Sequence, residues 1–495
     1  MSFLSGKRGL IPIILFIAIC FALSAWSTIN GRPAPSIDNL TYKYPGFQLV
    51  KHSQFSVPAM EGFYKGIEKI FLLHPPLYPL CFAGWILIFG FSLPSALAFE
   101  FFLHFLIALC LYKIVNKLLY PKSEYWAFFA GLVYFFPVSY LDRPERLSIL
   151  LGLTAFYIIH YIPKLRIWLK AAFAGILSGL ALSSHLIVGG LYLIYLAFSV
   201  FDKKSFKEPL RFIAIIFGIS TGVLACIWLP FILPNKEFFA GQFIKHFLDN
   251  LVGTRDIPAN LMETFKYLKF AFPLIAALLI FPFFSGLRNG KFAIIGIYFI
   301  VGLCAVFTST KSTYFASLVP LIYISVIKDI VLWFKQPKSK GAGGVFIKAV
   351  FVSAIFFHLM PAIPGNLTPF FAQKEDRYDF SYARIAGEIP QGAKVLTDGV
   401  FWYCLAGKAR IYDSYFTWPE QIKNCDYILL SANGSGTPGV PSILKKISVR
   451  DYIENNFKVV DTTLSFEPNM VFKIPVSHSR WGYRFVLFKR KSGLL

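Results

Sequence analysis

Long apolar runs recur through the first 365 residues of this chain of 495 residues, and they constrain its fold more than any motif. Hydrophobic residues make up 56% of the sequence, charged residues only 15%, and the mean hydropathy is +0.59. A helix needs about 20 such residues to cross the roughly 30 Å hydrocarbon core of a bilayer. Because hydrocarbon offers no hydrogen bonds, each crossing must satisfy its own backbone groups. The sequence therefore excludes a soluble globule and predicts a polytopic α-helical membrane protein.

We expect about eleven crossings. The first, residues 10–29, could instead be a signal peptide, but no Ala-x-Ala-like cleavage site follows cleanly, so we interpret it as an anchor. The predicted crossings are 10–29, 94–119, 124–140, 144–162, 168–184, 186–201, 210–233, 264–285, 291–308, 312–334 and 345–363.

A further apolar run, residues 76–92, is short and is interrupted by proline at both ends. If it crossed the membrane, the next crossing would carry Lys113 and Lys117 outside, against the positive-inside bias. We therefore predict a re-entrant or interfacial helix.

The basic residues set the predicted orientation. Lys7 and Arg8 place the N-terminus in the cytoplasm, and the formal charge of +23 then serves chiefly to orient helices, so we expect no nucleic-acid partner. The predicted location is the cytoplasmic (inner) membrane, with multiple passes. The connections that this places inside contain Lys164, Arg166 and Lys170; Lys203, Lys204, Lys207 and Arg211; Arg288 and Lys291; and Lys335, Lys338 and Lys340.

After residue 365 the composition becomes mixed and polar, which predicts a transmembrane domain over 1–365 and an extracytoplasmic α/β domain over 366–495. Expected strands at 394–397, 426–430, 457–460 and 484–488 alternate with helical patterns at 378–389 and 441–456. Of the seven cysteines, only Cys404 and Cys425 could plausibly pair, since the others lie in apolar helices.

The polar motifs all fall on the predicted outer side. They come from the first outer loop (30–75), the start of the short apolar run, and two later connections. In chain order they are Asp38, the run His74-Pro-Pro-Leu-Tyr78, the run Asp142-Arg143-Pro-Glu145, and Lys311 with Tyr314 three residues on. Four separate segments thus predict one candidate active site at the outer surface.

This order of motifs resembles the GT-C superfamily of membrane glycosyltransferases over roughly residues 10–365, most closely the bacterial relatives of protein mannosyltransferases and of the lipid A aminoarabinose transferase. The resemblance implies transfer of a sugar from a polyprenyl-phosphate donor to an acceptor hydroxyl of a lipid, glycan or protein. Members often carry an acidic pair in the first loop, whereas here Asn39 follows Asp38.

Such chemistry gives the motifs roles. Asp38 would be the catalytic base that takes the proton of the acceptor hydroxyl, or alternatively a cap for the helix starting near Leu40. Arg143 and Lys311 would stabilise the departing phosphate, unless they are interfacial cations that extend to lipid headgroups.

The remaining motif residues are expected to bind substrate. His74, Tyr78 and Tyr314 would contact the donor, although His74 could equally be structural. Asp142 and Glu145 could orient the sugar or bind Mg²⁺ or Mn²⁺, yet two carboxylates are not a metal signature, and a helix-capping role is the alternative.

Glu100 and His104 lie one helical turn apart inside a predicted crossing, and we expect them to neutralise each other. Residues 234–263 form the longest predicted outer connection, either a lid or a plain solvated loop.

Other functional classes remain open. A lipid-linked glycan flippase or polymerase would also span the membrane many times, but it should depend on intramembrane charges or an arginine-rich outer loop. An inactive sugar-binding relative would keep the fold and lose the chemistry, for which Asn39 could be a sign. A transporter should show repeated, broken helices, which this sequence lacks.

Overall fold

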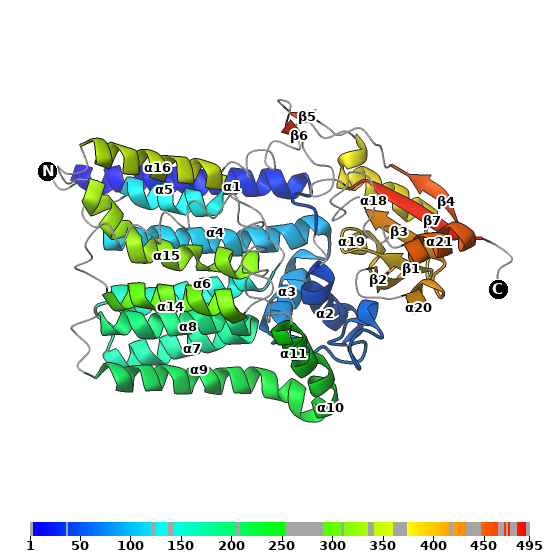
Figure 1. Cartoon of the computed structure of the whole chain (residues 1–495), viewed down its shortest axis with the longest axis horizontal. Coiled ribbons are helices and arrows are strands. Elements are labelled where there is room, and N and C mark those ends of the chain that lie inside the picture. Colours follow the sequence, from blue (N-terminus) through cyan, green and yellow to red (C-terminus); the bar gives the residue numbers. More distant parts are fainter. Residues whose placement is uncertain are drawn as a thin grey trace.

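The protein consists of a helical bundle followed by a smaller α/β part, as the computed structural model shows (Figure 1). The structure describes residues 3–35, 38–119, 124–136, 143–202, 208–252, 291–307, 311–334, 341–359, 374–414, 419–431, 447–463, 470–471, 474–475 and 483–491. The predicted domain boundary near residue 365 lies outside these residues.

The bundle helices coincide with the apolar runs, because an apolar run must satisfy its backbone within itself. They are α1 (Phe3–Ile29), α4 (Leu93–Leu118), α5 (Glu124–Phe135), α6 (Glu145–Tyr161), α7 (Ile167–Ser184), α8 (Leu186–Phe201), α9 (Pro209–Ile232), α14 (Lys291–Phe307), α15 (Lys311–Phe334) and α16 (Ala342–Leu359). The run 264–285 lies outside the described residues.

Among the described residues, four helical stretches are long and apolar enough to cross a membrane: Ile11–Ile29, Leu93–Leu118, Ile167–Ser184 and Pro209–Leu248. These stretches support the membrane class. The count of eleven crossings stays a prediction.

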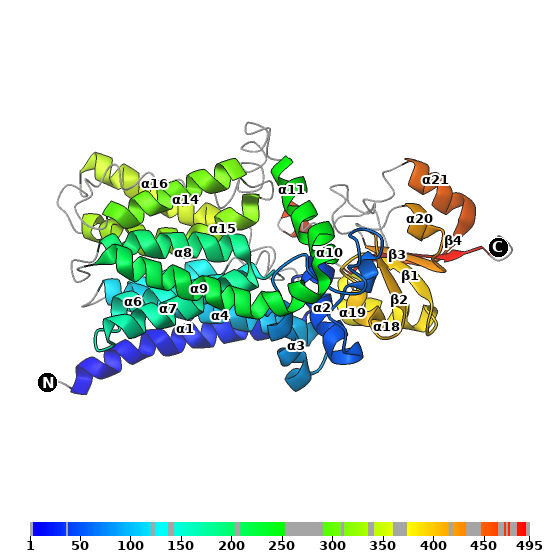
Figure 2. The ribbon, with the colours of Figure 1, turned by 90° about the horizontal axis from the view of Figure 1, so that it is seen from below.

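Two short helices, α2 (Asp38–His52) and α3 (Leu77–Phe89), lie at the end of the bundle that faces the sheet, opposite the N-terminus (Figures 1 and 2). They pack closely: a Cβ on Gly46 would lie 2.4 Å from the carbonyl oxygen of Pro79. Helix α3 begins after Pro76 and ends at Gly90, where φ is 76°. Its last turn carries three strongly exposed apolar side chains, Leu87, Ile88 and Phe89.

Residues 234–252, predicted as part of an outer connection that is either a lid or a plain loop, are helical, so the plain-loop alternative was wrong for this stretch. After α9 come η2 (Leu233–Asn235), α10 (Lys236–Phe239), the π-helical turn η3 (Ala240–Ile244) and α11 (Lys245–Val252). Buried Gln242 fixes this arm: its Oε1 accepts from the Leu72 amide at 2.8 Å, and its Nε2 donates to the Ile70 carbonyl at 2.9 Å. Residues 253–263 lie outside the described part.

The C-terminal part contains a five-stranded sheet of order β2-β1-β3-β7-β4, in which β1, β2 and β3 are parallel and β7 runs antiparallel to both neighbours. The strands are β1 (Lys394–Thr397), β2 (Arg410–Asp413), β3 (Tyr427–Ser431), β4 (Phe457–Thr462) and β7 (Phe485–Arg490), with a separate pair β5 (Met470–Val471) and β6 (Ile474–Pro475). The helices are η5 (Lys374–Asp376), α18 (Tyr378–Glu388), α19 (Trp402–Leu405), α20 (Pro419–Ile422) and α21 (Ile447–Asn456). The four strands predicted from sequence are present.

Cys404 and Cys425 are both free. Cys425 is fully buried in the core around β3, whereas Cys404 packs against the core shared with the bundle. The two cysteines are therefore not partners.

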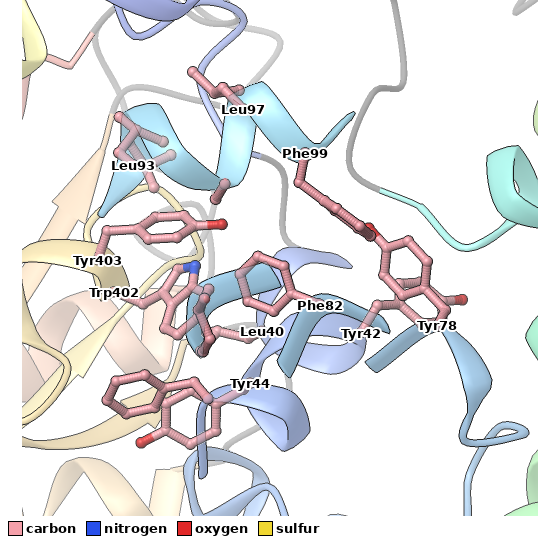
Figure 3. Packing of buried hydrophobic residues seen from close by; sticks show 14 of the residues in the cluster. Leu40, Tyr42, Tyr44, Tyr78, Phe82, Leu93, Leu97, Phe99, Trp402 and Tyr403 are labelled. Atoms are coloured by element: carbon pink, nitrogen blue, oxygen red, sulfur yellow. The ribbon is translucent and has the colours of Figure 1, made fainter. Parts of the chain in front are cut away.

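The two parts meet where α19 packs against α2 and α4 (Figure 3). The ring of Trp402, which is completely buried, lies 5.3 Å from Tyr44, 6.0 Å from Phe47 and 5.2 Å from Phe91. Aromatic pairs at these separations contribute beyond their buried area. One hydrophobic core thus continues from the bundle into the α/β part.

Candidate functional site

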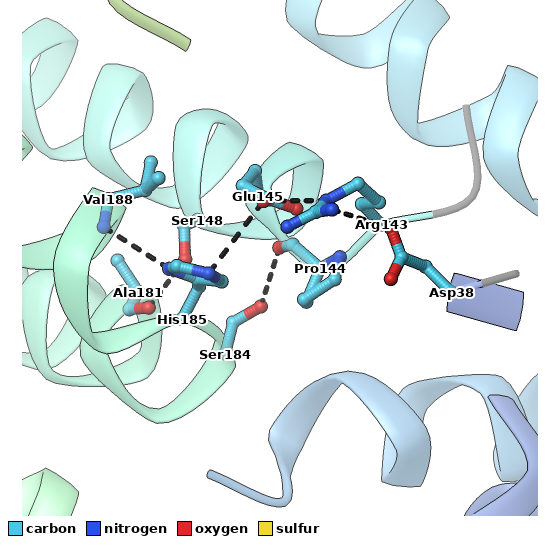
Figure 4. A network of polar contacts seen from close by, with 9 residues as sticks. All are labelled: Asp38, Arg143, Pro144, Glu145, Ser148, Ala181, Ser184, His185 and Val188. Atoms are coloured by element: carbon cyan, nitrogen blue, oxygen red, sulfur yellow. Dashed lines mark hydrogen bonds and ion pairs between the residues drawn. The ribbon is translucent and has the colours of Figure 1, made fainter. Parts of the chain in front are cut away.

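The first predicted outer loop and the Arg143 motif meet directly. Asp38 opens α2, and its Oδ2 accepts from Nη1 of Arg143 at 2.5 Å. Nε of Arg143 donates to Oε1 of Glu145 at 2.9 Å. The Asp38 and Arg143 side chains are 29% and 13% exposed, and Glu145 only 3%. One guanidinium therefore joins two carboxylates at a partly open place (Figure 4).

His185 closes this group from the opposite side. It breaks the chain between α7 and α8 in an extended conformation, and its Nδ1 accepts from the Val188 amide at 3.3 Å. A ring nitrogen that accepts carries no proton, so Nε2 is the protonated one. Nε2 faces Oε1 of Glu145 at 3.7 Å. We call Asp38, Arg143, Glu145 and His185 the open cluster.

Hydroxyl groups hold the helices that carry the open cluster. Ser184 donates to the carbonyl of Pro144 at 3.0 Å, and Ser148 donates to that of Ala181 at 2.6 Å (Figure 4). Each bond ties the start of α6 to the α7–α8 junction. Arg143 and Glu145 are thereby held in register with His185.

Aromatic and histidine rings line the same place. His74 lies 4.9 Å from the Tyr42 ring, 5.3 Å from His246 and 6.3 Å from His185. The guanidinium carbon of Arg143 lies 5.6 Å from the centroid of Tyr42. Burial, and then the neighbouring His246, His185 and Arg143, hold the pKa of His74 well below its usual range. His74 is therefore neutral at pH 7 and can offer hydrogen bonds but no charge.

Tyr314 and His246 complete the ring layer. The Tyr314 ring, on α15, lies 5.7 Å from His185. Nδ1 of His246, on α11, shares a 2.8 Å hydrogen bond with the hydroxyl of Tyr64. The predicted site residues Asp38, His74, Arg143, Glu145 and Tyr314 are thus brought together from four segments.

Tyr78 goes elsewhere. It is fully buried and its hydroxyl donates to Oε1 of Glu100, which also pairs with Nζ of Lys43 at 2.9 Å. Lys43 and Glu100 are 1% and 0% exposed. We call Lys43, Tyr78 and Glu100 the sealed cluster. Its burial does not support the predicted contact of Tyr78 with substrate.

The expected mutual neutralisation of Glu100 and His104 is wrong. Glu100 has the partners just described, whereas His104 contacts the guanidinium of Arg146 and the carbonyl of Phe135, the latter at 3.0 Å. Helical spacing placed the two residues on neighbouring positions, but other helices supplied their partners.

Two predicted site residues have no described side chain. Asp142 lies outside the described residues. Lys311 is the first residue of α15, and its side chain is not among the described ones.

The possible Mg²⁺ or Mn²⁺ site finds no support in the described residues, since no group of three His, Cys, Asp or Glu side chains there could hold a metal. Glu145 already pairs with Arg143.

Two residues of the site, His185 and Tyr42, were not predicted from the sequence. A signal for His185 was present: Ser183-Ser184-His185 is a polar break in an otherwise apolar stretch, at the boundary between two predicted crossings. Tyr42 had no comparable signal, because only the fold brings its ring beneath Arg143.

No family model and no curated protein matches the chain. Solved structures do match the chain. ArnT from Cupriavidus metallidurans in the apo state superposes with a TM-score of 0.55 at 11% identity, covering 96% of this chain and 97% of ArnT. ArnT from the same organism bound to undecaprenyl phosphate superposes with a TM-score of 0.53 at 12% identity, covering 97% of this chain and 98% of ArnT.

The oligosaccharyltransferase AglB from Archaeoglobus fulgidus, in complex with an inhibitory peptide and a dolichol-phosphate, gives 0.51 at 12% identity, covering 99% of this chain and 77% of AglB. At these identities the likeness establishes the fold. The chain shares the fold of ArnT and AglB, which confirms the resemblance predicted from its motifs at the level of the fold.

Proposed function

We propose that this protein is a GT-C glycosyltransferase that moves a sugar from a polyprenyl-phosphate donor to an acceptor hydroxyl at the outer face of the cytoplasmic membrane. The observation that carries the proposal is the partly exposed Asp38 carboxylate, held by Arg143 where four motif segments converge. The GT-C fold supports it, as do the lipid phosphates bound by ArnT and AglB.

The proposed reaction needs a base more than an acid. The acceptor oxygen forms a bond to the anomeric carbon while the bond between that carbon and the phosphate oxygen breaks. Its electron pair leaves with the polyprenyl phosphate, and the acceptor proton passes to Asp38. Phosphate is already a good leaving group, so no strong general acid is required. Positioned bases of this kind contribute about 10²- to 10⁴-fold in rate.

Arg143 has two proposed tasks. Its guanidinium orients Asp38, and its charge stands close to where the phosphate becomes more negative during bond breaking. Glu145 and His185 keep the guanidinium in place. We further propose that Lys311 supplies the second positive charge on the phosphate.

The remaining residues would handle the sugar. Neutral His74 and the hydroxyl of Tyr314 would offer hydrogen bonds, and Asp142 would orient the sugar from the Arg143 motif. Glu145 would orient the sugar through Arg143, because its own side chain is only 3% exposed. Tyr78 would act only through the sealed cluster, by fixing α3.

The outward orientation can be tested separately. Single cysteines replacing exposed Ser53 or Gln391 in a cysteine-free background should react with an impermeant thiol reagent in intact cells. A cysteine at exposed Lys164, in the connection between α6 and α7, should not. Labelling of position 164 alone would show that the orientation is the opposite of the one proposed.

The activity test is transfer by the purified full chain. The protein would be incubated with several polyprenyl-phosphate sugars and a membrane lipid and glycan extract, and released polyprenyl phosphate would be measured. Release that requires both protein and acceptor supports the proposal. Flipping of donor across proteoliposomes without release would favour a flippase, and donor binding without either would favour an inactive relative.

A further inference from the structure

A hydrogen bond from the C-terminal part ends on the residue next to the proposed base. The hydroxyl of Tyr403, on α19, donates to Oδ1 of Asn39 at 2.7 Å, across 364 residues of sequence. Asn39 is 1% exposed and Tyr403 is 7% exposed, so the bond is shielded from water. Asn39 is also the residue where the first loop departs from the acidic pair common in GT-C members.

The geometry of α2 gives this bond its meaning. Consecutive helical residues point about 100° apart, so Asp38 and Asn39 face different neighbours. Asp38 meets Arg143 of the bundle, and Asn39 meets Tyr403 of the α/β part. The first turn of α2 is therefore held from two sides, by two parts of the molecule.

The segment just before α2 is held by the same part. Nη2 of Arg32 donates to the carbonyl of Asp376 at 2.9 Å, and the hydroxyl of Tyr483 donates to the carbonyl of Gly31. Gly31 has a φ of +64°, and a Cβ there would lie 2.3 Å from the Tyr378 ring. Gly31 and Arg32 are thus closely packed against residues of the C-terminal part.

The aromatic contacts of α19 add rigidity. Tyr403 stacks on Phe91 at 5.4 Å, beside the Trp402 contacts with α2 (Figure 3). Its hydroxyl is consequently aimed by a ring that cannot swing freely.

We infer that the C-terminal part belongs to the site: Tyr403 and Asn39 are positioning residues that set where Asp38 stands relative to Arg143. The placement stands on the contacts above, and its consequence for turnover rests on the proposed function. A misplacement of about 1 Å can reduce an enzyme's rate by about 100-fold, so loss of one such bond should be measurable in turnover.

The test compares Tyr403→Phe with Tyr382→Phe in the full chain. Each variant loses one hydroxyl bond, but that of Tyr382 goes to the Val400 carbonyl inside the C-terminal part. Hydrogen exchange is measured by mass spectrometry on peptides covering residues 38–48. Tyr403→Phe should speed their exchange about 3- to 10-fold, whereas Tyr382→Phe should leave it within about twofold. Equal exchange in both variants overturns the placement.

Turnover is the second measurement. Tyr403→Phe should lower kcat about 10-fold with the donor KM within about twofold, because alignment changes and donor contacts do not. Asn39→Asp, which keeps an acceptor oxygen, should retain most turnover, and Asn39→Leu should not. Faster exchange with unchanged kcat overturns the positioning role. A wild-type protein without transferase activity defeats the proposed function, while the exchange result still decides the placement.

Discussion

Helix α2 contributes to two charged clusters that differ in access rather than in chemistry. Asp38 pairs with Arg143 at 2.5 Å in the open cluster, and Lys43, five residues on, pairs with Glu100 at 2.9 Å in the sealed cluster. The first pair is 29% and 13% exposed, and the second 1% and 0%. Each of these two pairs joins one carboxylate to one cation.

The difference indicates what each cluster can do. A fully buried ion pair loses its hydration whether or not a ligand binds, so it fixes the arrangement of helices but gives no substrate access. A partly exposed pair keeps one side available. Burial, and not residue type, therefore separates the proposed catalytic carboxylate from the structural one. Four experiments test this difference.

The largest effect should follow loss of the base in the open cluster. Asp38→Asn keeps the shape and loses the proton affinity, so turnover should fall about 10²- to 10⁴-fold while donor binding and thermal unfolding change little. Asp379→Asn, at an exposed Asp–Arg pair of the C-terminal part, is the control. Near-normal turnover in Asp38→Asn would leave Asp38 as a helix-terminal residue paired with Arg143.

The sealed cluster should give the opposite result. Lys43→Met leaves Glu100 buried without its cation and should lower the free energy of unfolding by about 3–5 kcal/mol. The triple variant Lys43→Met/Glu100→Met/Tyr78→Phe removes all three polar groups and should recover most of that loss. Both are measured by unfolding in detergent. A loss below about 1 kcal/mol in Lys43→Met would mean that the cluster is hydrated.

The phosphate contact should have an intermediate effect. Arg143→Ala and Lys311→Ala should each weaken donor binding and turnover about 10- to 100-fold, with non-additive losses in the double variant because the two charges share one ligand. Arg143→Lys should recover part of the loss, since an ammonium cannot reproduce the planar two-point contact. Unchanged donor binding in both single variants would place the phosphate nearer His74 or the 234–263 segment.

The smallest effect concerns pH. The pKa of His74 is lowered in the folded protein, so below about pH 6.5 the unfolded chain binds a proton that the folded site does not. The free energy of unfolding should therefore decrease as the pH is lowered, by at most about 1.4 kcal/mol per pH unit for this group. Unfolding temperatures measured from pH 7.5 to 5.5 should fall less steeply for His74→Gln than for wild type. Parallel curves would contradict a neutral His74.

The sequence was most informative where one local pattern decides the structure. Apolar runs predicted the bundle helices, to the residue for 186–201 against α8 and within seven residues at the start of α1, because membrane helices satisfy their own backbone. Strand β2 was not predicted from the sequence. The helices within residues 234–252 were not predicted. Gln242 accepts there from the amide of Leu72, 170 residues earlier, and such a contact leaves no local pattern.

The candidate site likewise contains residues that the sequence predicted and residues that it did not. The motifs predicted that Asp38, His74, Arg143, Glu145 and Tyr314 would gather, since their order and side were readable. The partners of Glu100 and Asn39 could not be predicted from the sequence. The contacts of Glu100 with Lys43 and of Asn39 with Tyr403 leave no pattern in local spacing.

The exposed end of α3 has a consequence for how a substrate would arrive. Leu87, Ile88 and Phe89 are 70%, 76% and 60% exposed, and such a tip is stable when immersed among acyl chains. It would fix the depth of the molecule in the bilayer, with the preceding Pro75-Pro76 turn and His74 near the headgroup level. A phosphate anchored to a long isoprenoid lies at that same level, so a donor could reach Asp38 by lateral diffusion, with its tail never leaving the lipid.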